Sequence, residues 1–282
     1  MPRFKRYRRI APHRAERLFG LRPRSSTVGN RLLAQELVGR WALLQGDCQD
    51  HGSRLRLDRL IARLESRDRG VQESAIAELE LATLLLRAGA RVEFLPESQA
   101  RSADLACHVA GERCFVEVTA MVGTSDRALR LGDSILAEDS DSEEGPATPE
   151  SIFRDAILAR VRQKAKQLAD YCAPVVLAIS VPRLDEERAR SPWSPKIGLD
   201  VRHLAGSISL VLPPLRHLSG VLLALWDVEP LPATSAVRLA NVSIVERSRQ
   251  HLAYPRLRML VRNPGARCPL TEAQTDIFRG LL

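Results

Sequence analysis

The stretch SADLACHVAGERCFVEVT, residues 102–119, contains two short apolar runs separated by Ala110-Gly111. A small residue followed by glycine, between two such runs, is typical of the short connection in a β-hairpin. We therefore expect strands at 103–109 and 113–119. If the pairing is centred on Ala110-Gly111, Asp104 lies directly opposite Glu117 on the neighbouring strand.

Two opposed carboxylates repel each other unless a cation lies between them. Oxygen-ligand magnesium sites commonly use one or two carboxylates together with a substrate phosphate. The pair Asp104 and Glu117 therefore predicts a divalent-cation site, and the alternative is that one of the two side chains points to water. Thr119 lies on the same face of its strand as Glu117, because strand side chains alternate.

Before the hairpin, the periodicity of residues 71–88 predicts a helix that ends at Gly89. Glu78 falls on the same row as three apolar residues, so we expect it to face the sheet. A carboxylate on an apolar helix face is costly unless it is paired or bound to a metal. Glu80 falls on a different row with Glu73 and Arg87, which predicts a partly solvated side.

After the hairpin, we expect a helix with Thr148 as its N-cap that runs to about Tyr171. A buried central strand is expected to follow at 175–181. Lys164 falls on the apolar row of this helix, and Gln167 lies one turn further on at its boundary. Only four of the 42 basic residues are lysines, so a lysine on this face suggests chemistry that arginine cannot provide. The alternative is a lysine that extends along the helix edge into water.

Together these segments resemble the core of the PD-(D/E)XK nuclease superfamily, over roughly residues 71–181. In that superfamily a helix glutamate precedes a hairpin that carries an Asp and a Glu-x-Lys motif. The resemblance implies an α/β restriction-endonuclease-like fold, a mixed sheet flanked by helices. It also implies Mg²⁺ or Mn²⁺ held by Asp104 and Glu117, with Glu78 assisting directly or through water.

The chain departs from the superfamily pattern at two positions: Ala103 replaces the proline of the motif, and Thr119 replaces its lysine. Some members of the superfamily recruit a lysine from the following helix, and Lys164 matches that position. The resemblance then implies hydrolysis of phosphodiester bonds, with Lys164 orienting the attacking water or neutralising the transition state. The alternative, favoured by Thr119, is a catalytically inactive member that serves as a scaffold for nucleic acid or a protein.

The positive charge of the chain is concentrated near its start. Residues 1–65 carry 15 Lys and Arg against 6 Asp and Glu, whereas the net charge of the whole chain is +8. Such a basic arm is suited to a polyphosphate backbone, and the partner we expect is DNA, with RNA as the alternative. The alternative is a solvated tail that promotes solubility. The candidate contacts are Arg3, Lys5, Arg6, Arg8 and Arg9.

We expect two regions: a basic arm with helices over residues 1–65, and a nuclease domain over 66–282. The second contains residues 138–150, which hold six acids and no base and are predicted to form a disordered loop. No apolar run is long enough to span a membrane, no signal segment is evident, and no cysteines form a CxxC pair. These features predict a cytoplasmic protein with reduced thiols, and a homodimer if both strands of a duplex are cut.

Overall fold

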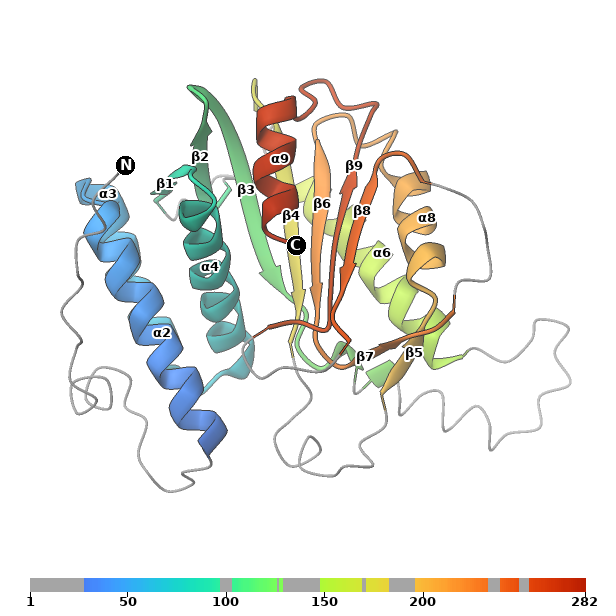
Figure 1. Ribbon diagram of the computed structural model, residues 1–282, viewed down its shortest axis with the longest axis horizontal. Coiled ribbons are helices and arrows are strands. Elements are labelled where there is room, and N and C mark those ends of the chain that lie inside the picture. The colour runs from blue at the N-terminus through green and yellow to red at the C-terminus, as the bar shows by residue number, and fades with distance from the viewer. Residues whose placement is uncertain are drawn as a thin grey trace, which may run out of the picture.

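The computed structural model describes residues 28–96, 103–125, 127–128, 148–168, 171–182, 196–232, 239–248 and 254–282. Two predictions fall outside these ranges. One is the basic arm with Arg3, Lys5, Arg6, Arg8 and Arg9, and the other is the acidic segment from residue 138 to 147. The described part of the chain is a mixed α/β structure in which helices cover both faces of a central sheet (Figure 1).

The elements follow one another in three groups. The first group is α2 (Val28–Asp47), α3 (His51–Leu64), α4 (Arg69–Arg87) and β1 (Arg91–Phe94). The second group is β2 (Leu105–Val109), β3 (Glu112–Ala120), α6 (Pro149–Gln167) and β4 (Val175–Val181). The third group is β5 (Ile197–Leu199), α8 (Val201–Val211), β6 (Gly220–Leu225), β7 (Val228–Pro230), β8 (Val242–Glu246), β9 (Leu257–Arg262) and α9 (Glu272–Gly280).

Within the described residues, the main sheet has seven strands in the order β1-β2-β3-β4-β6-β9-β8. The strand β3 pairs in parallel with β4, which pairs in parallel with β6, whereas the other neighbours are antiparallel. A second sheet consists of β5 and β7 in parallel. The mixed sheet confirms the expected α/β class, and β4 in its middle confirms the predicted central strand.

Local sequence signals explain why the elements begin and end where they do. Asp68 caps the N-terminus of α4 by accepting from the N–H groups of its first turn, and Thr148 caps α6 in the same way. Gly89, at φ +95°, lies directly behind the C-terminus of α4, where glycine is favoured. Ala110 and Gly111 both have positive φ, which confirms the two-residue hairpin turn.

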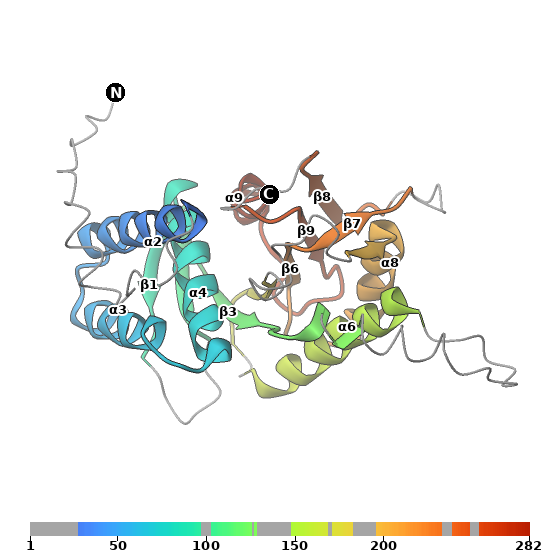
Figure 2. The ribbon, with the colours of Figure 1, turned by 90° about the horizontal axis from the view of Figure 1, so that it is seen from below.

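The sheet separates two hydrophobic cores. On one face, α6 and α8 pack on the sheet through residues such as Phe153, Ile157 and Leu204. On the other face, α2, α3, α4 and α9 contribute residues such as Leu57 and Leu79. Figure 2 shows α2, α3 and α4 grouped at one end of the molecule, with α6 extending under the sheet toward α8. Helices α2 and α3, from the region before residue 66, therefore share a core with the hairpin.

Helix α6 is shorter than the sequence predicts. It ends at Gln167, and the backbone of Leu168 is already extended. Tyr171 consequently lies outside the helix, and its ring stacks on Phe115 of β3 with centroids 4.0 Å apart. Its hydroxyl accepts a hydrogen bond from the N–H of Ala103 at 2.7 Å. Tyr171 thus contacts the segment just before β2 and the strand β3, and it does not belong to the apolar row of the helix.

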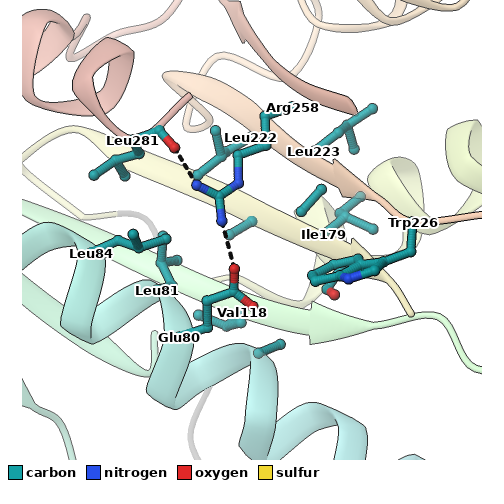
Figure 3. Close-up of a pocket in the computed structure, with 14 residues that line it drawn as sticks. Glu80, Leu81, Leu84, Val118, Ile179, Leu222, Leu223, Trp226, Arg258 and Leu281 are labelled. Carbon is teal, nitrogen blue, oxygen red and sulfur yellow. Dashed lines mark hydrogen bonds and ion pairs between the residues drawn. The ribbon is translucent and has the colours of Figure 1, made fainter. Parts of the chain in front are cut away.

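The prediction that Glu80 lies on a partly solvated side is wrong. Glu80 is buried and pairs with Arg258 of β9, which also donates to the carbonyl oxygen of Leu281 (Figure 3). Arg40 of α2 lies 3.5 Å from the second oxygen of Glu80. These contacts close one wall of an apolar pocket next to Trp226. The helical row could not reveal this, because the partners come from distant segments that dock on α4.

The cysteines are free thiols, and three of them, Cys48, Cys107 and Cys114, are buried in the core on the α4 face. Burial raises the pKa of the Cys48 thiol to about 12. A thiol with such a pKa stays protonated and unreactive near neutral pH. Cys48 therefore behaves as a packing group. Among the described helices, none combines the length and the apolar character that a membrane crossing requires.

Candidate active site

The hairpin register brings two carboxylates together. Leu105 pairs with Val116, and continuing this register by one residue places Asp104 opposite Glu117, as the sequence predicts. Asp104 lies just before β2, and its N–H donates to the carbonyl oxygen of Val116 at 3.0 Å. The register is fixed by the two-residue turn, so the local hairpin geometry alone determines this juxtaposition.

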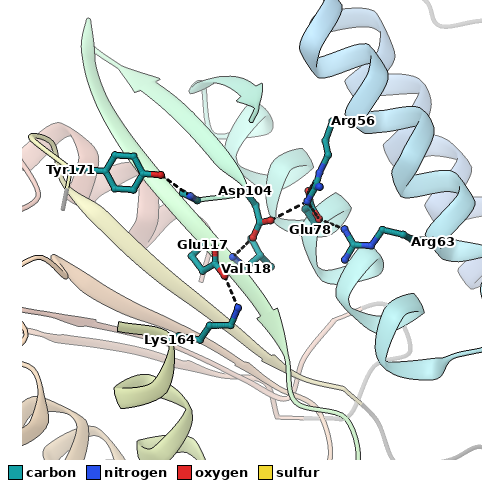
Figure 4. Close-up of polar contacts among 9 residues, drawn as sticks. Arg56, Arg63, Glu78, Asp104, Glu117, Val118, Lys164 and Tyr171 are labelled. Atoms are coloured by element: carbon teal, nitrogen blue, oxygen red, sulfur yellow. Dashed lines mark hydrogen bonds and ion pairs between the residues drawn. The ribbon is translucent and has the colours of Figure 1, made fainter. Parts of the chain in front are cut away.

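Glu117 is buried on the face of β3 that α6 covers, where it meets Lys164. The Nζ atom of Lys164 donates to Oε1 of Glu117 at 2.7 Å (Figure 4). Burial raises the pKa of Glu117 to about 7, and the neighbouring carboxylate of Asp104 adds to the increase, whereas Lys164 opposes it. The lysine on the apolar row of the helix therefore reaches the hairpin carboxylate.

Asp104 is held on both of its oxygens. The backbone N–H of Val118 donates to Oδ2 at 2.8 Å, and a guanidinium nitrogen of Arg56 donates to Oδ1 at 3.0 Å. The side chain of Asp104 keeps 21% of its surface exposed, more than those of Glu78 or Glu117. Of the three acids, Asp104 is consequently the most accessible to solvent or to a ligand.

Glu78 is the most buried of the predicted acids, with 2% of its side-chain surface exposed. Its two oxygens accept from Arg56 at 3.0 Å and from Arg63 at 2.9 Å, both on α3. Burial raises the pKa of Glu78 to about 7, the charge of Asp104 adds to this, and the two arginines oppose it. The buried position on α4 is as predicted, and the charged partners were not anticipated.

Asp104 lies between the other two acids. Figure 4 shows Glu117 and Lys164 on one side of Asp104, and Glu78 with its two arginines on the other. The same separation follows from the strands and helices, since α6 and α4 cover opposite faces of the sheet. Asp104 therefore connects a Glu117–Lys164 pair to a Glu78–Arg56–Arg63 cluster.

Arg56 and Arg63 are site residues that the sequence analysis missed. A detectable signal existed for Arg56, which lies on α3 in one row with Ser53, Leu57 and Leu60, all of them buried. The test that identified Glu78 and Lys164, a charged residue on an apolar helix row, would have identified Arg56 as well. Arg63, three residues after Leu60 and seven after Arg56, lies on the same row of α3, although its side chain is 27% exposed.

Thr119 and Gln167, the two remaining site candidates, differ in where the structure places them. Thr119 is buried on the same face as Glu117, in agreement with strand alternation. Gln167 lies exposed at the last turn of α6. Among the described residues, no hydrogen bond joins Gln167 to Asp104, Glu117 or Lys164. Thr119 thus borders the acid pair, and Gln167 is not brought into contact with it.

Asp104 and Glu117 are the two residues whose carboxylates could hold a cation together. Asp104 and Glu117 offer oxygen atoms on adjacent strands. The raised pKa of Glu117 has burial as its main cause and the charge of Asp104 as a second cause. Glu78 fits less well, because its side chain is only 2% exposed and two arginines donate to it. The described residues contain no group of three or more His, Cys, Asp or Glu side chains arranged to hold a metal ion.

Comparisons of the chain with protein-family models, with curated proteins and with solved structures find no match. Any functional statement about the chain therefore depends on the arrangement of its own residues.

Proposed function

We propose that the chain is a metal-dependent nuclease of the PD-(D/E)XK type that hydrolyses phosphodiester bonds of DNA, with RNA as the alternative substrate. The observation that carries this proposal is the opposition of Asp104 and Glu117 on adjacent strands, with the Nζ atom of Lys164 2.7 Å from Glu117. Two carboxylates and a lysine in one place can bind a divalent cation and stabilise an anionic transition state.

The order of elements agrees with this proposal. A helix with an inward-facing glutamate, α4, is followed by the strands β1, β2 and β3 as an antiparallel meander. Helix α6 then leads to β4, which pairs in parallel with β3. The restriction-endonuclease-like pattern expected from residues 71–181 has the same sequence of elements. The three acids and Lys164 belong to it, whereas Arg56 and Arg63 precede it.

In the proposed mechanism, Asp104 and Glu117 would hold Mg²⁺ or Mn²⁺. When bound, the cation would polarise a phosphoryl oxygen and lower the pKa of a water molecule. Lys164 has two roles that its position permits: it neutralises Glu117 in the metal-free protein, and it places a positive charge beside the acid pair. During hydrolysis that charge would orient the attacking water or offset the charge that develops on the phosphorus oxygens.

Basic residues outside the acid pair would hold the nucleic-acid backbone. Three exposed or half-exposed cations on α6, Arg160, Arg162 and Lys166, have no ion-pair partner within the described residues. The basic arm with Arg3, Lys5, Arg6, Arg8 and Arg9 adds to this charge. Contacts of this kind position a phosphate backbone and do not read its sequence.

A second candidate function is a catalytically inactive scaffold of the same fold that binds nucleic acid or a protein. The observation that favours it is the pairing of all three acids with cations of the chain itself: Lys164 with Glu117, Arg56 with Asp104 and Arg56 with Glu78. In such a network each of the three acids has a positively charged partner even without a metal. Thr119 at the position of the superfamily's lysine points in the same direction.

The two candidates separate in a cleavage assay on plasmid and single-stranded DNA with Mg²⁺, Mn²⁺ or EDTA. We expect metal-dependent cleavage by the wild type that is lost in Asp104→Asn and Glu117→Gln, which keep the side-chain shape and remove the charge. Glu112→Gln, an exposed glutamate at the start of β3, is the matched control and should cleave like the wild type. Salt-sensitive DNA binding without cleavage would favour the scaffold instead.

A further inference from the structure

One arginine occupies the position between two of the acids. The guanidinium of Arg56 donates to Oε1 of Glu78 through Nε and to Oδ1 of Asp104 through Nη2, both at 3.0 Å. Its side chain is 5% exposed, so this double contact is made inside the protein. Arg56 belongs to α3, an element that precedes the segment with the nuclease-like pattern.

The same contacts limit what Glu78 can do. One oxygen of Glu78 accepts from Arg56 and the other from Arg63, and the side chain is 2% exposed. Glu78 and Glu117 also lie on opposite sides of Asp104 (Figure 4). The acid pair therefore has Lys164 bound to Glu117 and Arg56 bound to Asp104, and Glu78 is bound to Arg56.

We propose that Arg56 is a positioning residue that determines the cation occupancy of this site. Glu78 anchors Arg56, and Arg56 in turn holds Asp104 and excludes Glu78 from the metal. The site then accepts a single cation, whose side-chain ligands among the described residues are Asp104 and Glu117. This inference rests on the proposed function, since it presupposes that the acid pair binds a divalent cation.

A measurable consequence is that the charge of Arg56 weakens cation binding. A positive guanidinium in contact with Asp104 repels a divalent cation that binds the same carboxylate. Removing Arg56 together with its anchor Glu78 leaves the acid pair intact and removes this repulsion. The paired substitution also avoids a buried, uncompensated charge, because breaking a buried ion pair from one side is strongly destabilising while replacing both partners is tolerated better.

The test is the affinity and stoichiometry of Mn²⁺ binding to the full-length chain, measured by calorimetry at constant pH and salt. The variants are Arg56→Gln/Glu78→Gln and, for comparison, Glu78→Gln. We expect one Mn²⁺ per chain in the wild type, and an affinity about tenfold tighter in the double variant. Arg63→Gln is the matched control, since Arg63 contacts Glu78 but has no hydrogen bond to Asp104 in the described structure, and it should change the affinity less than threefold.

The outcomes discriminate between this inference and the proposed function. An equal or weaker Mn²⁺ affinity in the double variant, or two Mn²⁺ per wild-type chain, would identify Glu78 as a ligand and overturn the role of Arg56, while the nuclease proposal would stand. A folded wild-type chain that binds no Mn²⁺ would overturn both. Circular dichroism of each variant without metal shows whether it is folded, and Arg56→Lys serves as a second variant that keeps the charge but loses the two-acid contact.

Discussion

The Nζ atom of Lys164 lies 2.7 Å from Oε1 of Glu117, although the two residues are 47 positions apart in the chain. Lys164 comes from α6 and Glu117 from β3, and the parallel pairing of β3 with β4 brings the intervening helix across that face of the sheet. The contact places a lysine beside the acid pair in a chain whose strand motif has Thr119 instead.

We predict that Lys164→Ala lowers the cleavage rate by about 10²- to 10³-fold, the effect of losing one charge-stabilising donor at a reacting phosphate. Mn²⁺ affinity should be unchanged or tighter, because a cation next to Glu117 is removed. The measurement is the single-turnover cleavage rate, with Mn²⁺ binding measured in parallel. Lys196→Ala is the control and should retain nearly full activity, because Lys196 is an exposed lysine that pairs with Glu229 and not with an acid of the site. Wild-type rates in Lys164→Ala would show that another group performs this role.

We predict that metal-free stability depends on pH through Glu117. Its pKa is raised from 4.5 to about 7 in the folded chain, so the folded state binds this proton more tightly than the unfolded state. Stability from this group is therefore present below about pH 4.5 and is lost as the pH rises through about 7. In EDTA, the melting temperature of the wild type should fall between pH 5 and pH 8 by several degrees more than that of Glu117→Gln. Parallel curves for the two proteins would contradict the raised pKa.

We predict that Mn²⁺ stabilises the wild type and does not stabilise Asp104→Asn. A ligand that binds only the folded state at about 100 times its Kd adds about 2.7 kcal/mol to the free energy of unfolding. The substitution removes the charge at the acid shared by both clusters while keeping its shape. Thermal melts with and without Mn²⁺ measure the difference. Equal stabilisation of both proteins would place the cation elsewhere on the chain.

We predict that the basic arm contributes sequence-independent DNA affinity. Replacing Arg3, Lys5, Arg6, Arg8 and Arg9 with Gln should lower the slope of log affinity against log salt by about four to five, since each lost phosphate contact accounts for about 0.9. The loss should be similar for unrelated DNA sequences. Fluorescence anisotropy over a salt series measures the slope. An unchanged slope would favour the interpretation of the arm as a solvated tail.

We predict that Glu80→Gln destabilises the fold by about 3–5 kcal/mol, because it leaves the buried charge of Arg258 without its acid. Cation binding at the acid pair should be unaffected, since Glu80 lies beside a separate apolar pocket. Urea unfolding measures the first effect and Mn²⁺ calorimetry the second. Exposed Glu112 is the control, and Glu112→Gln should change stability by less than about 0.5 kcal/mol.

The candidate site was predictable from the sequence where the signal is local. The two-residue turn at Ala110-Gly111 fixes the register, and the register fixes Asp104 opposite Glu117. Helical periodicity places Glu78 and Lys164 on inward-facing rows, and both are confirmed as buried or half-buried. Arg56 carried the same local signal on α3, and applying the test to that helix would have found it.

The charge partners were not predictable in the same way. The helical row of Glu80 predicts a partly solvated residue. In the structure Glu80 is buried, because its partner Arg258 comes from β9, 178 positions away in the chain. Arg56 meets Asp104 because α3 packs on the α4 face of the sheet, close to the point where β2 begins. Such contacts depend on how helices and strands pack together, and the spacing of residues within one helix or strand does not predict them.

The sequence by itself determined the α/β class, the hairpin, the central strand and the inward direction of Glu78 and Lys164, because turn chemistry and periodicity act over a few residues. Tertiary structure decided which cation meets which acid, and thereby that Asp104 stands between a lysine pair and an arginine cluster. The physical reason is that a buried charge requires a partner wherever packing brings one within reach. That partner is selected by the docking of distant helices and strands on the sheet.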